Sequence, residues 1–317
     1  MCELLLLAIW ACSAEPAART PLYAGRSVGE WIGRLSDEDI RVRWQATYAL
    51  GQLGPAAAEA VGPLMEILED QYEYEYVRGG AAWALGRIGP AAEPAVPLLI
   101  GTLGSKHLSV RRNAPLVLGR LGRAARAAVP DLLRLLEDGD PTVRANAAAG
   151  AWGIARSPRA LQTLLAMLRS TRPEEAYRAT VAIGWLGTEA EPMIAPLVET
   201  LRHADADARR AAARALGRMG EVALGPLEQA LEDPSGQLRR GAVAALGVIG
   251  RPALPALIRA LEDPAAVVRY GAARAIGRMG TQAGSTLDAL IKRVDDPDPM
   301  VRRAVAEAIK RVRDGER

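Results

Sequence analysis

The sequence predicts an all-α fold, a right-handed α-solenoid of about nine two-helix repeats. Three observations predict it: a motif that recurs at a nearly constant spacing, helical periodicity within each copy, and a core of small aliphatic residues. The 317-residue chain is 50% hydrophobic but only 4% aromatic, and it contains no Phe. Closely packed helices suit this composition better than a β-sandwich or barrel, which favours aromatic and β-branched residues.

The recurring motif reads Val-Arg-x-x-Ala-x-x-x-Leu-Gly-x-Ile-Gly, and it occurs nine times with variations. Its copies begin at Val42, Val77, Val110, Val143, Glu175, Ala208, Leu238, Val268 and Val301, 30 to 35 residues apart. A period of this length is typical of stacked structural repeats, in which each unit is stabilised by its neighbours. We expect each copy to be the second helix of a helix pair.

The repeat at residues 253–280 shows how one unit should fold. An amphipathic first helix is indicated by apolar residues at i, i+3, i+4 and i+7, namely Leu254, Leu257, Ile258 and Leu261. We expect Asp263 to cap the second helix, with Pro264 at its first position. Gly280 should end that helix, because glycine accepts a positive φ.

Three features of the motif resemble the HEAT repeat, in the short bacterial form often labelled phycobilisome-lyase-like. They are the Asp-Pro turn, the Val-Arg pair and the final Ala-Leu-Gly-x-Ile-Gly. The resemblance covers residues 27–313 and leaves 314–317 as a polar tail. It implies the fold but says little about function, since the family includes scaffolds, lyases and DNA-repair enzymes.

Residues 1–20 form a separate segment. The apolar run Leu4–Ala11, followed by small residues, is similar to an export signal, and Cys12 is then a candidate lipid anchor. Residues 1–3 contain no Lys or Arg, so a disordered N-terminus is the alternative. The run is too short for a transmembrane helix. We expect a periplasmic or envelope-associated protein if the signal is functional, and a cytoplasmic one otherwise.

Arginine concentrates on one face of the expected second helices. With the Val of the motif as position 0, positions +2, +6 and +10 share a face and should point away from the core. Eleven of these 27 residues are Arg and one is acidic, whereas the whole chain has 40 basic and 37 acidic residues. Because HEAT arrays place their second helices on the concave side, the resemblance implies a cationic groove.

The groove prediction divides into an aromatic N-terminal part and a basic part that begins at Arg210. The candidate binding residues are Trp44, Tyr48, Trp83, Arg87, Arg112, Arg120, Tyr177, Trp185, Arg210, Arg214, Arg218, Arg240, Tyr270, Arg274 and Arg278. Arg makes bidentate contacts with carboxylates, and Trp and Tyr act as anchors. We therefore predict a scaffold that binds an acidic, partly aromatic segment of a protein partner. In the alternative, these arginines pair with carboxylates of adjacent repeats.

The sequence offers little support for catalysis. His107 and His203 are not followed by Glu, unlike the His-Glu pairs of the di-iron HEAT hydroxylases, and both cysteines lie within the first 12 residues. Each Gly-x-x-Gly is a repeat end rather than a phosphate loop. We expect no cofactor, no metal and no enzymatic activity. A nucleic-acid-binding HEAT protein and a phycobilin-lyase-like or other HEAT enzyme remain the alternatives.

Two further features concern the turns. An acidic residue stands six positions before the motif arginine in the pairs Asp37/Arg43, Asp138/Arg144, Asp233/Arg239, Asp263/Arg269 and Asp296/Arg302, and we expect structural charge-assisted bonds within each turn. The segment Gln71–Tyr76 replaces the Asp-Pro turn with alternating Tyr and Glu. We interpret it as a tolerated loop, with a partner-contact edge as the alternative.

Overall fold

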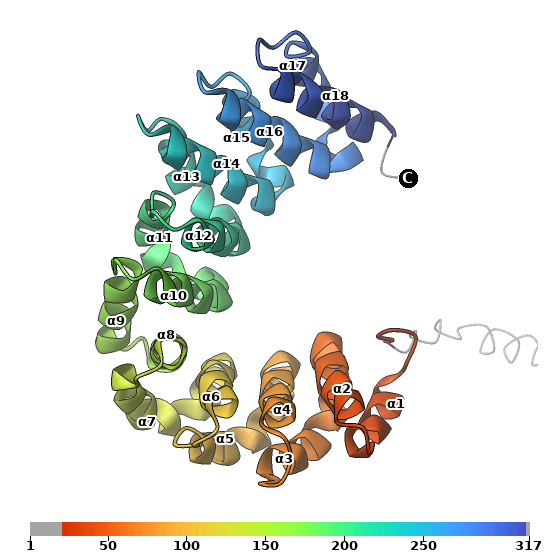
Figure 1. Ribbon diagram of the computed structural model, residues 1–317, viewed down its shortest axis with the longest axis vertical. Helices are drawn as coiled ribbons and strands as arrows, with labels where there is room; N and C mark the ends of the chain where they lie inside the picture. The colour runs from red at the N-terminus through yellow and green to blue at the C-terminus, as the bar shows by residue number, and fades with distance from the viewer. Residues whose placement is uncertain (1–20, 315–317) are drawn as a thin grey trace, which may run out of the picture. The chain divides into compact units, whose positions relative to one another are not determined.

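The computed structural model describes residues 21–314, which form nine helix pairs separated mostly by 3₁₀ segments (Figure 1). Within this range the only β-structure is an isolated bridge between Tyr23 and Arg26. The predicted all-α fold of two-helix repeats is thereby confirmed. The predicted leader, residues 1–20, and the last residues of the predicted tail, 315–317, lie outside the described residues.

Each pair consists of a shorter first helix and, in general, a longer second helix. The first helices are α1 (Val28–Gly33), α3 (Val61–Glu69), α5 (Val96–Thr102), α7 (Val129–Arg134), α9 (Pro158–Leu168), α11 (Ile194–Thr200), α13 (Leu224–Leu231), α15 (Leu254–Ala260) and α17 (Leu287–Ile291). The second helices are α2 (Ile40–Leu53), α4 (Glu75–Ile88), α6 (Leu108–Leu121), α8 (Pro141–Ala155), α10 (Pro173–Leu186), α12 (Ala206–Met219), α14 (Gly236–Ile249), α16 (Ala266–Arg278) and α18 (Pro299–Asp314). None of these helices is both long and apolar enough to cross a bilayer.

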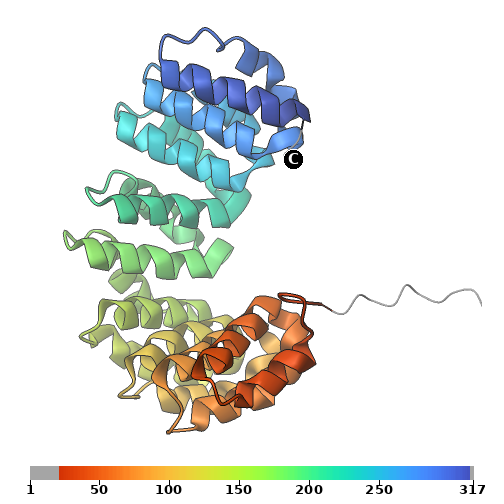
Figure 2. The same ribbon diagram turned by 45° about the vertical axis from the view of Figure 1, so that its right-hand side comes forward.

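The chain divides into two compact units, and the boundary falls between Leu98 and Leu99, inside α5. In the second unit, α10, α12, α14, α16 and α18 lie on one side, and α9, α11, α13, α15 and α17 lie on the other (Figure 1). Consecutive second helices pack against each other from α6 to α18, and α14, α16 and α18 run side by side (Figure 2). This side of the second unit therefore presents successive second helices in a row.

Glycine ends most of the second helices, as the sequence predicts. The seven glycines at these positions have φ between +55° and +86°, namely Gly54, Gly89, Gly122, Gly187, Gly220, Gly250 and Gly280. The expected cap at Asp263 is wrong, because α16 begins at Ala266 and its N-cap residue is Ala265. The Asp263 carboxylate instead accepts a hydrogen bond of 2.8 Å from the Ala265 N–H, which fixes the turn before the helix.

Small residues bring the second helices close together. A Cβ on Gly150 of α8 would lie 2.4 Å from the Pro115 carbonyl oxygen of α6, so this helix pair has no room for a side chain there. Ala145 and Ala149, which the periodicity places on the exposed face, are fully buried because α8 packs between α6 and α10. The cationic face is therefore interrupted at α8.

Candidate binding surface

Five of the arginines that follow the first residue of the motif connect successive repeats. We call Arg43, Arg111, Arg144, Arg239 and Arg269 the turn arginines. The Nη1 of Arg269 donates to the backbone carbonyl of Asp263, six residues earlier, at 2.9 Å. Its Nε and Nη2 donate to the carboxylate of Asp296, in the next repeat, at 2.8 and 2.7 Å. The expected ion pair within the turn is therefore wrong: the earlier residue contributes its carbonyl, and the carboxylate comes from the following repeat.

The same arrangement recurs along both units. Each of the other turn arginines donates to a carbonyl six residues earlier and to an acidic residue of the next repeat: Arg43 to Asp37 and Glu73, Arg111 to Ser105 and Asp138, Arg144 to Asp138 and Glu175, and Arg239 to Asp233 and Asp263. The Asp263 carboxylate accepts a hydrogen bond from a backbone N–H of its own turn. This bond orients the carboxylate toward Arg239 in the preceding repeat. The turn arginines therefore serve the fold.

The pairs of Arg269 and Arg239 are largely buried. The side chain of Arg269 is 9% exposed and that of Asp296 is fully buried. Hydrogen bonds from Arg269 lower the pKa of Asp296, and the same bonds raise the pKa of Arg269. Burial alone would raise the pKa of Asp263, but hydrogen bonds from Arg239 and from the Ala265 N–H outweigh it, so that pKa is also lowered. Both carboxylates are thus held in their charged form.

A second set of arginines projects from α12, α14, α16 and α18 without such partners. Among the described residues no carboxylate forms an ion pair with any of the six arginines that we call the groove arginines: Arg214, Arg218, Arg240, Arg274, Arg278 and Arg303. All six are exposed. Two other arginines on this face are paired within their own helix, Arg210 with Asp207 and Arg311 with Glu307. The face therefore keeps an unneutralised positive charge.

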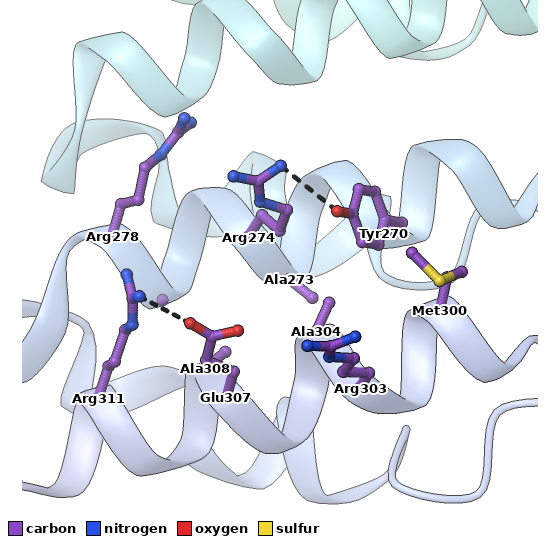
Figure 3. Close-up of a pocket in the computed structure, with 11 residues that line it drawn as sticks. Tyr270, Ala273, Arg274, Arg278, Met300, Arg303, Ala304, Glu307, Ala308 and Arg311 are labelled. Carbon is purple, nitrogen blue, oxygen red and sulfur yellow. Dashed lines mark hydrogen bonds and ion pairs between the residues drawn. The ribbon is translucent and has the colours of Figure 1, made fainter.

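The groove between α16 and α18 encloses about 310 Å³, and arginines line both of its sides (Figure 3). The Nη1 of Arg274 lies 3.3 Å from the Tyr270 hydroxyl, and its guanidinium carbon lies 5.6 Å from the centre of the Tyr270 ring. This contact orients Arg274 toward the groove. Alanines form the floor, and the longer side chains form the rim, where α16 contributes Tyr270, Arg274 and Arg278 and α18 contributes Met300, Arg303, Glu307 and Arg311.

Trp185 on α10 lies between a basic side chain of α6 and one of α12. The guanidinium carbons of Arg120 and Arg218 lie 5.7 and 5.9 Å from its ring centre, a distance typical of cation–π contacts. Arg120 and Trp185 line a smaller groove of about 200 Å³. The structure therefore brings together the predicted residues Arg120, Trp185 and Arg218.

Arg112 behaves as the alternative interpretation predicts. Its Nη2 and Nε donate to the carboxylate of Asp140, in the next repeat, at 2.5 and 3.1 Å. These bonds lower the pKa of Asp140 to about 2. The pairing is specific to this position, because the six groove arginines lack a comparable acid.

The aromatic candidates Trp44, Tyr48 and Trp83 belong to the first unit, where they stack on one another. The rings of Tyr48 and Trp83 are nearly parallel, with centres 5.4 Å apart, and those of Trp44 and Tyr48 are 5.9 Å apart. Arg87 donates to the Gly51 carbonyl at 3.3 Å and lies 6.0 Å from the Trp83 ring centre. Trp44 and Tyr48 remain 43% and 39% exposed. This stack belongs to the first unit, whereas the groove arginines belong to the second.

Tyr177, which was predicted, is half-buried, and the guanidinium carbon of Arg178 lies 5.3 Å from its ring centre.

The sequence pattern missed some residues of the surface. Met300 on the groove rim and Asp207, the partner of Arg210, were not predicted. Both stand directly before the motif, three residues before position +2, and so share its face. Extending the series of positions +2, +6 and +10 by one helical turn toward the N-terminus would have found them.

The histidines do not form a metal site. The Nδ1 of His203 accepts the Asp205 N–H at 3.0 Å, and its Nε2 lies 3.4 Å from the Ser170 carbonyl oxygen, so its ring stabilises a turn. No group of three or more metal-ligating side chains occurs in the part of the chain that the structure describes.

Comparison with known proteins agrees with the repeat geometry. A family model for HEAT repeats matches residues 29–115, 97–184, 162–235, 194–277 and 224–310. The chain belongs to the HEAT-repeat family. No curated protein matches it in sequence.

Two solved structures are similar to this HEAT-repeat chain. One is the complex of CpcE and CpcF of phycocyanin lyase from Nostoc sp. PCC7120, at 25% identity over 94% of this chain and 97% of that one, with a TM-score of 0.38. The other is human deoxyhypusine hydroxylase in complex with glycerol, at 22% identity over 80% of this chain and 96% of that one, with a TM-score of 0.33.

Proposed function

We propose that this HEAT-repeat protein is a non-catalytic interaction scaffold whose second unit binds an acidic, partly apolar segment of a protein. The observation that carries the proposal is the row of six groove arginines, which project from α12, α14, α16 and α18 without a carboxylate partner among residues 21–314. A ligand carboxylate can bind these arginines without breaking an existing ion pair, so its binding does not have to offset the loss of one.

The surroundings of these arginines favour a protein ligand. Val248 and Met300 on the same face are 47% and 54% exposed, and Tyr270 lines the groove beside Arg274. These side chains offer contacts to apolar groups of a peptide. Glu307 and Asp207 also lie on this face, where each is already paired with an arginine of its own helix. Short clusters of carboxylates separated by apolar residues fit this pattern better than a nucleic acid.

The test uses a fluorescent 12-residue peptide of alternating Glu and Phe, with a peptide of alternating Gln and Phe as its control. Fluorescence anisotropy measures binding to the wild-type chain and to the variant Arg214→Glu/Arg240→Glu/Arg303→Glu. Because each reversal replaces an attraction with a repulsion, at about 1 kcal/mol each, we expect affinity for the Glu peptide to fall about 100-fold at low salt.

A matched variant controls for the change in net charge. Arg123→Glu/Arg126→Glu/Arg251→Glu alters three exposed arginines of the 3₁₀ segments, which line none of the grooves described above, and it should bind the peptide like the wild type. Equal loss in both triple variants would contradict the proposal. Single-stranded and duplex DNA are measured at the same ionic strength, and tighter binding of either than of the Glu peptide would favour the nucleic-acid alternative.

A further inference from the structure

We propose that the acidic segment bound by the groove arginines is a turn of a second copy of this chain. The turn is residues 69–76, with the sequence Glu-Asp-Gln-Tyr-Glu-Tyr-Glu-Tyr, and we call it the tyrosine turn. This inference rests on the proposed function and names the partner. It is carried by the chemistry of the turn, which matches the groove in both charge and apolar character.

The tyrosine turn is held in one conformation by the first unit. Arg43 donates to both carboxylate oxygens of Glu73, at 2.6 and 2.8 Å, and the N–H of Tyr74 donates to the same carboxylate at 2.7 Å. The N–H of Tyr72 donates to the Asp70 carboxylate at 2.8 Å. A turn that is already ordered loses little conformational entropy when it binds, and this increases the affinity that its contacts provide.

The three tyrosines of this turn are displayed rather than packed. Tyr72, Tyr74 and Tyr76 are 88%, 59% and 46% exposed, in a chain that is only 4% aromatic. The rings of Tyr74 and Tyr76 touch each other, with centres 6.1 Å apart. Clustered exposed aromatic side chains are typical of interaction sites, where tyrosine serves as an anchor.

The turn also has the charge that the groove requires. It contains four acidic residues and no basic one; Glu73 is buried against Arg43, whereas Glu69 and Asp70 are exposed. The nearest arginine that follows it, Arg78, is buried and donates to the Leu68 carbonyl at 2.9 and 3.1 Å, so it does not offset this charge at the surface. The tyrosine turn therefore presents carboxylates and phenol rings together.

The groove between α16 and α18 offers the complementary groups. Alanines, Tyr270 and Met300 line it together with Arg274, Arg278 and Arg303 (Figure 3). In the proposed contact the apolar groups cover a tyrosine ring of the second copy, and the arginines bind the carboxylates that flank the ring. A volume of about 310 Å³ is at the low end of ligand sites and suits one aromatic side chain rather than a whole helix.

The proposed contact joins two different surfaces, since the turn belongs to the first unit and the groove to the second. Each copy then keeps one free turn and one free groove after pairing. Such a heterologous contact produces head-to-tail chains, or rings if the rotation closes. The expected behaviour is a mass that rises with protein concentration and falls as salt is added.

The experiment is sedimentation velocity on the full chain, from low to high micromolar concentration, at low and high salt. The groove variant is Arg274→Glu/Arg278→Glu/Arg303→Glu, and the turn variant is Glu69→Lys/Tyr72→Ser/Tyr74→Ser. Each should remain a monomer where the wild type associates, with self-association weakened at least about tenfold. The charge-matched variant Arg123→Glu/Arg126→Glu/Arg251→Glu should associate like the wild type.

Mixing the two variants gives the decisive result. The groove variant retains its turn and the turn variant retains its groove, so an equal mixture should form a one-to-one dimer and nothing larger. All the substituted side chains are exposed, and circular dichroism checks that both variants keep the wild-type helix content. A mixture that stays monomeric would overturn the inference, and so would a wild type that stays monomeric at every concentration and salt.

A peptide distinguishes this inference from the proposed function. A labelled peptide of residues 66–78 should bind the turn variant, whose groove is intact, about tenfold more tightly than a peptide of the same composition in scrambled order. Equal binding of the two would contradict recognition of the turn. If the alternating Glu-Phe peptide binds but the wild type does not self-associate, the inference fails and the proposed function stands. If the Glu-Phe peptide does not bind, the proposed function fails as well.

Discussion

Two rows of arginine run along the second unit, and in α14 they lie one residue apart. Arg239 is a turn arginine with a 12% exposed side chain bonded to Asp263, whereas Arg240 beside it is exposed and has no ion pair among the described residues. The helical rotation of about 100° between neighbours sends one side chain toward the next repeat and the other toward solvent. The difference shows that partner geometry, not residue type, separates the turn arginines from the groove arginines in this chain.

The largest expected effect comes from breaking the buried row. Arg269→Ala leaves the fully buried carboxylate of Asp296 without its cation, and it removes the bonds to the Asp263 and Pro264 carbonyls. We expect the free energy of unfolding to fall by about 3–5 kcal/mol. Arg303→Ala removes an exposed arginine and should change it by less than about 0.5 kcal/mol. Urea denaturation measures both, and similar effects of the two substitutions would contradict the division into two rows.

The next effect tests the close approach of two neighbouring second helices, α6 and α8. In Gly150→Ala the new methyl group would lie 2.4 Å from the Pro115 carbonyl oxygen, which cannot rotate away as a side chain would. We expect a loss of about 2–3 kcal/mol from overpacking between α6 and α8. Gly139→Ala is the control, because its methyl group would meet nothing within 4 Å. Thermal unfolding of both variants is the measurement, and equal melting temperatures would show that α6 and α8 can separate freely.

The smallest effect concerns Arg112, the exception on the cationic face. Its bonds to Asp140 lower the pKa of that carboxyl from 3.8 to about 2, so the pair stabilises the folded state above about pH 4 and this contribution is lost as the pH falls toward 2. The gap in unfolding free energy between the wild type and Asp140→Asn should be about 2 kcal/mol at neutral pH. It should close between about pH 4 and pH 2, since Asn still caps α8. A gap that stays constant with pH would contradict the lowered pKa of Asp140.

The repeat pattern predicted the fold well because each repeat contains its own signals. Apolar residues at helical spacing and glycine at the helix ends were both read from the sequence, and Gly280 has the expected positive φ. The partners of the turn arginines could not be read in the same way. The pairing of Arg269 with Asp296 depends on how one repeat stacks on the next, and the sequence offered Asp263 as an equally good acid.

The candidate surface was predicted in part. The exposed arginines of α12, α14 and α16 follow directly from helical geometry, since positions four residues apart share a face. The burial of Ala145 and Ala149 does not follow, because it depends on how closely α8 approaches its neighbours. The grouping of Arg120 and Arg218 around Trp185 likewise needs the four consecutive second helices from α6 to α12 in place.

The bonds of the turn arginines have a direction, because each one runs from a cation in one repeat to an acid in the repeat that follows. The repeats whose motifs begin at Val143 and Val268 therefore each carry one acceptor for the preceding repeat and one donor for the following repeat. Deleting or duplicating either of these repeats as a whole leaves the bonds matched, whereas removing half of one leaves a charge unpaired in the interior. The length of such an array can consequently change in whole modules, and a gain or loss of material tends to preserve the period of the chain.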